Sequence, residues 1–261
     1  MDIFPNHAKR RLTEGKVAVG MGLRLARTAD IATIVKTCGF DWVFIDMEHS
    51  SMDLDTAAQI ATACLPVGLT SIVRVPGKEH HHASRILDAG AQGICVPHVD
   101  TAEEAQRAVA HCKYPPVAHR SAMGTLPQFA YRSVPVGEAT AAANQETLVM
   151  VMLESPTAIE NAESIAAVPG IDILLIGTND LCMELGIPGQ FEHPKVEDAY
   201  RKVIAACRKH NVHPGMGGAY DPKLLEKYIG YGMRCVLCGG DMTFLMAGAR
   251  ERASFVHGLK V

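Results

Sequence analysis

Short apolar runs alternate with longer amphipathic segments along the whole chain. The apolar runs have the length and composition of buried parallel strands. They fall at eight places: Val17–Leu25, Asp41–Asp46, Thr70–Val75, Gly93–Pro97, Leu148–Leu153, Asp172–Gly177, Val212–Met216 and Arg234–Cys238. The segments between them are rich in Ala, Glu and Arg and predict helices over Ala29–Cys38, Leu54–Cys64, Ala102–Cys112, Ala158–Ala167, Val196–His210, Pro222–Tyr231 and Met242–Val256.

Eight β–α units in 261 residues predict an α/β fold, the (β/α)8 TIM barrel. An open doubly wound sheet is the alternative, but no GxGxxG turn follows the first strand. No low-complexity tract or Gly/Ser linker divides the chain, so we expect one domain over residues 1–261. The stretch 114–144, from Tyr114 to Asn144, interrupts the alternation and predicts a long rim loop that shapes substrate choice. Alternatively, residues 114–144 form a solvent-exposed loop that has no function.

Composition narrows the class of protein. The net charge of −3 gives no basic footprint for nucleic acid, and aromatic residues make up only 5%. The longest apolar run, Leu148 to Leu153, is far shorter than the roughly 20 residues of a membrane helix. The eight cysteines are scattered through apolar segments and predict reduced thiols. We therefore expect a cytoplasmic enzyme that binds neither nucleic acid nor membrane.

Charged side chains stand where the predicted strands end. In a barrel, the carboxyl ends of the strands form one rim and hold the active site. Charged groups next to apolar strands are costly unless they are paired or bind a metal, so their convergence predicts a site. The candidates at this rim are Asp46, Glu48, His49, Arg74, Glu154, Asp180 and, more weakly, His98.

Glu154 and Asp180 follow adjacent strands and suggest a divalent metal. Two carboxylates plus water suit a hard ion such as Mg²⁺ or Mn²⁺ and leave positions open for a bidentate substrate. The alternative for Glu154 is a cap partner at the helix start that follows it. The alternative for Asp180 is an acid that only complements the dipole of its own helix.

Asp46 and His49 are candidates for an orienting carboxylate and a general base. His49 could instead cap the next helix. Arg74 could hold a substrate carboxylate or stabilise a developing enolate oxygen; its alternative is a structural ion pair with Glu48 or Glu154. No lysine lies in any predicted strand, which disfavours a Schiff-base aldolase.

Several motifs follow one another in order between about Gly15 and Ala249. They are Phe44-Ile45-Asp46-Met47-Glu48-His49-Ser50, Val73-Arg74-Val75-Pro76, Leu87-Asp88-Ala89-Gly90-Ala91, Val96-Pro97, Lys113-Tyr114-Pro115-Pro116, Leu153-Glu154, Gly170-Ile171-Asp172, Ile176-Gly177 and Asp180-Leu181. Together they resemble the HpcH/HpaI aldolase family, the class II pyruvate aldolases. The resemblance implies a (β/α)8 barrel whose last helix is exchanged between subunits, in a homo-hexamer or another homo-oligomer. It also implies cleavage of a 4-hydroxy-2-oxo acid, such as 4-hydroxy-2-oxoheptanedioate or a 2-keto-3-deoxy sugar acid, to pyruvate and an aldehyde.

The resemblance assigns roles to residues of this chain. Glu154 and Asp180 resemble the family's ligands for a divalent metal: Mg²⁺ or Mn²⁺, with Co²⁺ or others also possible. Arg74 resembles its enolate-stabilising cation. His49, with Asp46, resembles the dyad that moves the proton of the 4-hydroxyl.

Two further roles concern binding and the neighbouring subunit. Asp88 resembles a residue that reaches the site of an adjacent subunit. The backbone around Gly177, Thr178 and Asn179 resembles the helix start that receives the pyruvate carboxylate, which agrees with the chemistry of helix N-termini.

The chain departs from the family pattern near the expected substrate. Met152 stands where many members have Gln, Ser121 where many have Gly, and Thr178-Asn179 where many have Pro-Ala or Pro-Ser. One alternative is therefore a lyase for a CoA thioester of the malyl-CoA or citramalyl-CoA type, although only the dispersed Arg120 and Arg132 could meet its phosphates. Another alternative is a relative of phosphoenolpyruvate mutase or isocitrate lyase, but this sequence does not contain the Lys-Lys-Cys-Gly-His stretch of those enzymes. A non-catalytic barrel that binds 2-oxo acids is the last alternative.

Overall fold

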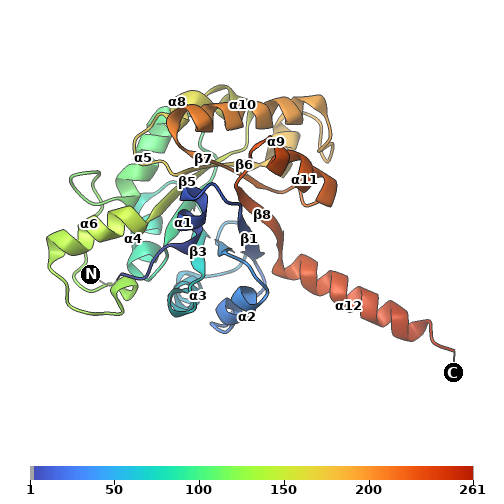
Figure 1. Ribbon diagram of the computed structural model, residues 1–261, viewed down its shortest axis with the longest axis horizontal. Helices are drawn as coiled ribbons and strands as arrows, with labels where there is room; N and C mark the ends of the chain where they lie inside the picture. Colours follow the sequence, from blue (N-terminus) through green and yellow to red (C-terminus); the bar gives the residue numbers. More distant parts are fainter. Residues whose placement is uncertain (1–2, 261) are drawn as a thin grey trace.

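Eight parallel strands close into a barrel in the computed structural model, which describes residues 3–260 (Figure 1). Each strand pairs with the next along the chain, and the last pairs with the first, so the predicted (β/α)8 barrel is confirmed. The strands are β1 (Ala18–Leu23), β2 (Trp42–Asp46), β3 (Thr70–Arg74), β4 (Gly93–Val96), β5 (Leu148–Leu153), β6 (Ile173–Gly177), β7 (His213–Gly217) and β8 (Cys235–Gly240).

Helices alternate with the strands along the chain, and most of them lie around the outside of the barrel (Figure 1). Within residues 3–260 they are α1 (His7–Thr13), α2 (Ile31–Thr37), α3 (Leu54–Val67), α4 (His80–Asp88), α5 (Ala102–Cys112), α6 (Val136–Glu146), α7 (Pro156–Glu160), α8 (Ala162–Ala166), α9 (Thr178–Glu184), α10 (Pro194–His210), α11 (Pro222–Tyr231) and α12 (Asp241–His257). None of these helices is long and apolar enough to cross a membrane.

Alternate residues of each strand face two different apolar layers, as the strand period of two requires. Phe44, Ile72 and Met150 belong to the cluster inside the barrel. Their neighbours Val43 and Val73 belong to the larger cluster between strands and helices. Both faces are thus buried, which explains why the strands read as continuous apolar runs.

The amino-terminal end of the barrel is closed by α1, which the hydrophobic pattern did not predict. Ala8 and Leu12 of this short helix are buried in the interior cluster with Trp42. The backbone N–H of Ala8 donates to Thr70 Oγ1 at 3.0 Å. The seven-residue helix offers too few apolar positions for a clear period in the sequence.

Most predicted boundaries differ from the structure by one to three residues, and three segments show differences that bear on the fold. The first strand ends at Leu23 rather than at residue 25. The single helix expected over 158–167 is two short helices, α7 and α8. Residues 114–144 are not one irregular loop, because they contain the 3-10 helix Pro127–Phe129 and most of α6. This segment joins α5 to the first residue of β5, so it borders the amino-terminal ends of the strands and not the rim that carries the candidate residues.

The last helix, α12, extends away from the barrel (Figure 1). None of its residues is buried, although it carries apolar side chains such as Phe244, Leu245, Met246 and Phe255. A helix with this much exposed apolar surface is typical of a protein–protein contact.

Candidate active site

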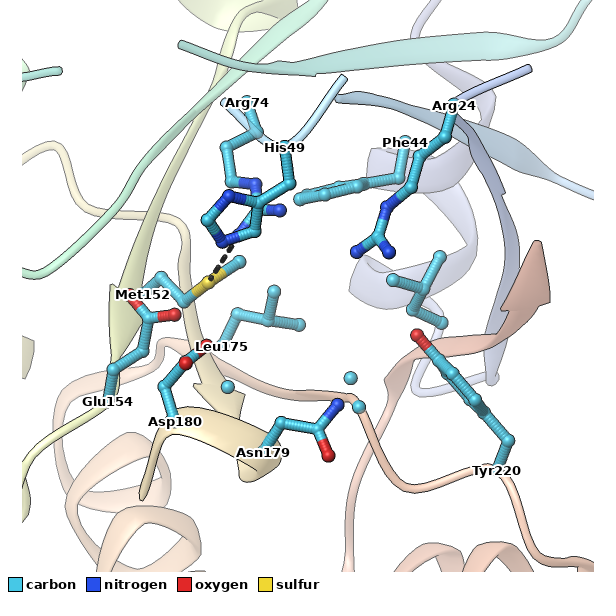
Figure 2. A pocket seen from close by; sticks show the side chains of 14 residues that line it. Arg24, Phe44, His49, Arg74, Met152, Glu154, Leu175, Asn179, Asp180 and Tyr220 are labelled. Carbon is cyan, nitrogen blue, oxygen red and sulfur yellow. Dashed lines mark hydrogen bonds between the residues drawn. The ribbon is translucent and has the colours of Figure 1, made fainter. Parts of the chain in front are cut away.

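A cavity of about 220 Å³ opens at the carboxyl ends of the strands (Figure 2). It gathers residues that lie in seven of the strands or directly after them, so residues from Arg24 to Leu237 meet in one place. Its lining consists of Arg24, Phe44, His49, Arg74, Met152, Glu154, Leu175, Gly177, Asn179, Asp180, Gly217, Gly218, Tyr220 and Leu237.

Arg74 forms a buried ion-pair network at the bottom of this cavity. Asp46 and Arg74 are register partners at the ends of β2 and β3. Nε and Nη2 of Arg74 donate to the two oxygens of Asp46 at 2.9 and 2.7 Å. Nη1 lies 2.9 Å from Glu48 Oε2, which is the structural pairing considered as an alternative for Arg74. The Arg74 guanidinium still lines the cavity, so these ion pairs fix its orientation and leave it facing the cavity.

Asp46 does not orient the ring of His49 in this structure. Its carboxylate accepts the backbone N–H groups of Glu48 and His49 at 3.2 and 3.1 Å, and Arg24 Nε at 2.8 Å. Burial raises the pKa of Asp46, but the hydrogen bonds and charge of Arg74 outweigh burial and hold that pKa below its usual range. The predicted side-chain dyad is corrected here: Asp46 fixes the backbone from which the half-exposed His49 projects into the cavity. His49 does not cap α3, because Asp53 does.

Glu154 is buried at the end of β5 and faces the cavity with Asp180 (Figure 2). One of its oxygens accepts the backbone N–H of His98 at 2.9 Å, and Nδ1 of the same residue lies 3.3 Å away. Burial, reinforced by the negative charge of Asp180, raises the pKa of Glu154 to about 7. Glu154 is not a cap for α7, since Ser155 accepts the N–H of Ala158 there.

The close packing of Gly177 holds Glu154 in position. A Cβ at residue 177 would lie 2.7 Å from Cγ and 2.8 Å from Oε1 of Glu154. Any side chain here would therefore displace the carboxylate. The missing side chain at residue 177 thus leaves the space that the Glu154 side chain occupies beside the cavity.

The two carboxylates fit a hard divalent cation. Oxygen donors suit Mg²⁺ and Mn²⁺, and like charges that share a site become favourable when a cation lies between them. Among residues 3–260, no cluster of three or more His, Cys, Asp or Glu side chains has the arrangement of a metal site. Glu154 and Asp180 would therefore need oxygen donors from substrate or water to complete a coordination shell.

A family model for HpcH/HpaI aldolase/citrate lyase matches residues 23–247. The chain belongs to this family. The predicted family and the predicted enzyme class, an aldolase, are thus confirmed.

Relatives of the HpcH/HpaI family resemble the chain over nearly its full length. It is 36% identical to 4-hydroxy-4-methyl-2-oxoglutarate aldolase tasA of Hapsidospora irregularis, an alignment that spans 100% of this chain and 98% of the relative. It is 32% identical to 5-keto-4-deoxy-D-glucarate aldolase of Klebsiella pneumoniae, over 96% of each chain. The crystal structure of an HpcH/HpaI aldolase from Desulfitobacterium hafniense superposes with a TM-score of 0.92 at 31% identity, and covers 99% of this chain and 98% of its own.

The other residues to which the resemblance assigned a role lie either at the cavity or away from it. Gly177 and Asn179 line the cavity, whereas the hydroxyl of Thr178 donates to Gly217 O at 2.7 Å and contacts Tyr200. Asp88 lies at the end of α4, away from the cavity of its own chain, and accepts Arg120 Nη2 at 2.6 Å.

Three residues of the HpcH/HpaI site were missed or undervalued in the sequence. Arg24 was placed inside the first predicted strand, but it directly follows β1 and lines the cavity. Tyr220 lies three residues beyond β7, too far for a rule that looks only at strand ends. His98 contacts both Glu154 and Glu48, with Nε2 at 3.5 Å from the latter.

Proposed function

We propose that this chain cleaves a 4-hydroxy-2-oxo acid to pyruvate and a second carbonyl compound. One observation carries the proposal: two carboxylates, Glu154 and Asp180, share a cavity with the oriented guanidinium of Arg74. The relatives named above support this reaction class, since their names describe aldolases that act on hydroxy-oxo acids or their keto-deoxy equivalents. A 4-hydroxy-4-methyl-2-oxo dicarboxylic acid is the first substrate to test.

The donor half of the substrate would bind between the acids and Arg74. A divalent cation held by Glu154 and Asp180 would supply Lewis-acid polarisation of the 2-oxo group. The backbone at Gly177 and Asn179 would receive the pyruvate carboxylate, with Thr178 between them as part of the same helix start. Mg²⁺ and Mn²⁺ are the ions we propose, by their preference for oxygen.

His49 would act as the general base. Its imidazole is half exposed at the cavity, where it would accept the proton of the 4-hydroxyl. The C3–C4 bond then breaks, its electron pair remains on the C3 side as the enolate of pyruvate, and C4 becomes the carbonyl carbon of the second product. Arg74 would stabilise the negative charge on the enolate oxygen. Uptake of one proton at C3 completes pyruvate.

We also propose that the enzyme works as a homo-oligomer, such as a hexamer, in which α12 packs on a neighbouring subunit. The exposed apolar residues of α12, including Phe244 and Leu245, support this arrangement. Asp88, at the end of α4 and paired with Arg120, would then reach the site of an adjacent subunit. Light scattering of the full chain and of a Phe244→Asp, Leu245→Asp variant tests this: the variant should dissociate.

A coupled assay tests the reaction. Purified protein is mixed with 4-hydroxy-4-methyl-2-oxoglutarate and Mg²⁺ or Mn²⁺, and pyruvate is measured with lactate dehydrogenase. We expect pyruvate release that EDTA abolishes, and that His49→Ala and Glu154→Gln lower by at least about 100-fold. Malyl-CoA and citramalyl-CoA form the second arm. Cleavage of these thioesters without cleavage of the free oxo acid would contradict the proposal.

A further inference from the structure

Arg24 is held in place from two directions. The carboxylate of Asp241 accepts the backbone N–H of Arg24 at 3.2 Å and those of Leu25 and Ala26 at 2.8 Å each. Asp46 accepts Arg24 Nε at 2.8 Å. A loop fixed by three hydrogen bonds to one carboxylate, together with a side chain fixed at Nε, leaves the guanidinium little freedom to turn away from the cavity.

The two terminal nitrogens of Arg24 remain available. Within residues 3–260, neither Nη1 nor Nη2 has a protein hydrogen-bond acceptor. Figure 2 shows the guanidinium pointing toward the same part of the cavity as the hydroxyl of Tyr220. The side chain is 53% exposed, so a ligand in the cavity reaches it directly.

This end of the cavity lies across from the two acids (Figure 2). Phe44 and Leu237 also line the cavity. These two residues, together with Arg24 and Tyr220, line an adjoining space of about 80 Å³ as well. Room for a further part of the substrate therefore continues past the position of the bond to be broken. Arg24 and Tyr220 supply hydrogen-bond donors to this space at neutral pH. The two carboxylates that also line it, Asp46 and Asp241, already accept the hydrogen bonds described above.

Two parallel N–H donors of a guanidinium match the two oxygens of a carboxylate, and a neighbouring hydroxyl adds a third donor. A neutral aldehyde offers no negative charge for such a group. We propose that Arg24 and Tyr220 form the subsite for the second carbonyl product, and that this product carries a carboxylate. The inference rests on the proposed aldolase function and specifies its substrate: a hydroxy-oxo acid with a second carboxylate on the C4 side.

The experiment measures aldol condensation of pyruvate with four acceptors. Glyoxylate and succinic semialdehyde carry a carboxylate next to and distant from the carbonyl, and acetaldehyde and butanal are their neutral counterparts. For the wild type we expect a higher kcat/KM with the carboxylated acceptor than with its neutral counterpart, wherever that carboxylate reaches the subsite. Arg24→Gln should lower this preference about 100-fold and Tyr220→Phe about tenfold, since charge-assisted hydrogen bonds are lost.

Two further variants sharpen the test. Arg24→Lys keeps the charge without the fork and should retain a preference within about tenfold of the wild type. Arg107→Gln removes an exposed arginine from α5, far from this cavity, and should retain the whole preference. If Arg24→Gln loses the preference in only one of the two acceptor pairs, that pair shows whether the subsite binds a carboxylate next to the carbonyl or one distant from it.

Other outcomes overturn the assignment. If Arg24→Gln and Tyr220→Phe lower the rate for carboxylated and neutral acceptors equally, Arg24 merely braces Asp46. If the wild type neither condenses pyruvate with any acceptor nor exchanges its methyl protons in the presence of Mg²⁺ or Mn²⁺, the proposed function fails and the subsite fails with it.

Discussion

Asp46 and Arg74 are register partners on adjacent strands, and their side chains form a bidentate pair with distances of 2.9 and 2.7 Å. Both residues are buried. A pair of this kind loses much of its hydration on folding, so each charge depends on the other. The pair therefore ties the orientation of the proposed enolate-stabilising group to the stability of the barrel rim.

Removing one member of this pair should destabilise the protein strongly. We expect Asp46→Asn to lower the free energy of unfolding by about 3 kcal/mol, because it leaves the charge of Arg74 poorly compensated. The double variant Asp46→Asn, Arg74→Gln should cost less than the sum of the single changes. Urea unfolding of Asp46→Asn, of Arg74→Gln and of the double variant measures these losses. Strictly additive losses would show that the two side chains do not depend on each other.

Gly177 should be needed for the position of Glu154. Gly177→Ala places a methyl group 2.7 Å from Glu154 Cγ and should lower Mn²⁺ affinity and activity about 10- to 100-fold. Gly137→Ala, in α6, is the matched control, because its Cβ meets nothing within 4 Å. Calorimetric titration with Mn²⁺ measures the affinity. Equal affinities for both variants would contradict the account of the acid pair.

Gly20 should be needed for the barrel core. A Cβ at this position would lie 2.2 Å from the ring of Trp42, whose Nε1–H donates to Ala18 O at 3.1 Å. Gly20→Ala should therefore lower the free energy of unfolding by about 3 kcal/mol through overpacking. Gly230→Ala, near the end of α11 and with open space around it, should be neutral or slightly stabilising. Similar urea midpoints for the two variants would contradict this packing.

Glu197 should stabilise the contact between α10 and α11 in a pH-dependent way. It accepts hydrogen bonds from Lys227, Arg201 and Tyr231, which lower its pKa to about 2. A depressed acid pKa contributes stability above the unfolded value of about 4.5, and that contribution is lost as pH falls toward 2. The urea midpoint of Glu197→Gln should lie below that of the wild type at pH 7, with a difference that narrows below pH 4.5.

The exposed carboxylate Glu226, also on α11, provides the control for this variant. It forms no hydrogen bond or ion pair with the part of the chain that the structure describes, so the urea midpoint of Glu226→Gln should stay close to that of the wild type at pH 7. A difference for Glu197→Gln that stays constant from pH 7 to pH 3 would show that the network does not stabilise the folded state.

The fold was predictable because every strand is buried on both faces. Runs such as Leu148–Leu153 have no polar interruption, and their spacing gave all eight strands within a few residues of their observed ends. The helix α1 was not predictable in the same way, because its two buried residues, Ala8 and Leu12, form a single i, i+4 pair. One such pair in a seven-residue helix is too short to establish a helical period in the sequence.

The site was predictable in part for a similar reason. Asp46, Arg74 and Glu154 end apolar strands, where a charge is conspicuous. The sequence does not show which acid pairs with which base, and Asp46 indeed pairs with two arginines and not with the ring of His49. Tyr220 lies in a loop, so its approach to the cavity follows from the path of the backbone after β7.

The most direct test of the proposed chemistry is the exchange of pyruvate methyl protons for deuterium. Pyruvate is incubated in D₂O with the wild type and Mg²⁺ or Mn²⁺, with EDTA in place of the metal, and with Glu154→Ala, and the methyl signal is followed by NMR. Enolate formation at this site predicts exchange with the metal-loaded wild type, and little or none with EDTA or the variant. Absence of exchange with folded, metal-loaded wild type, or exchange that does not depend on Glu154, would contradict it.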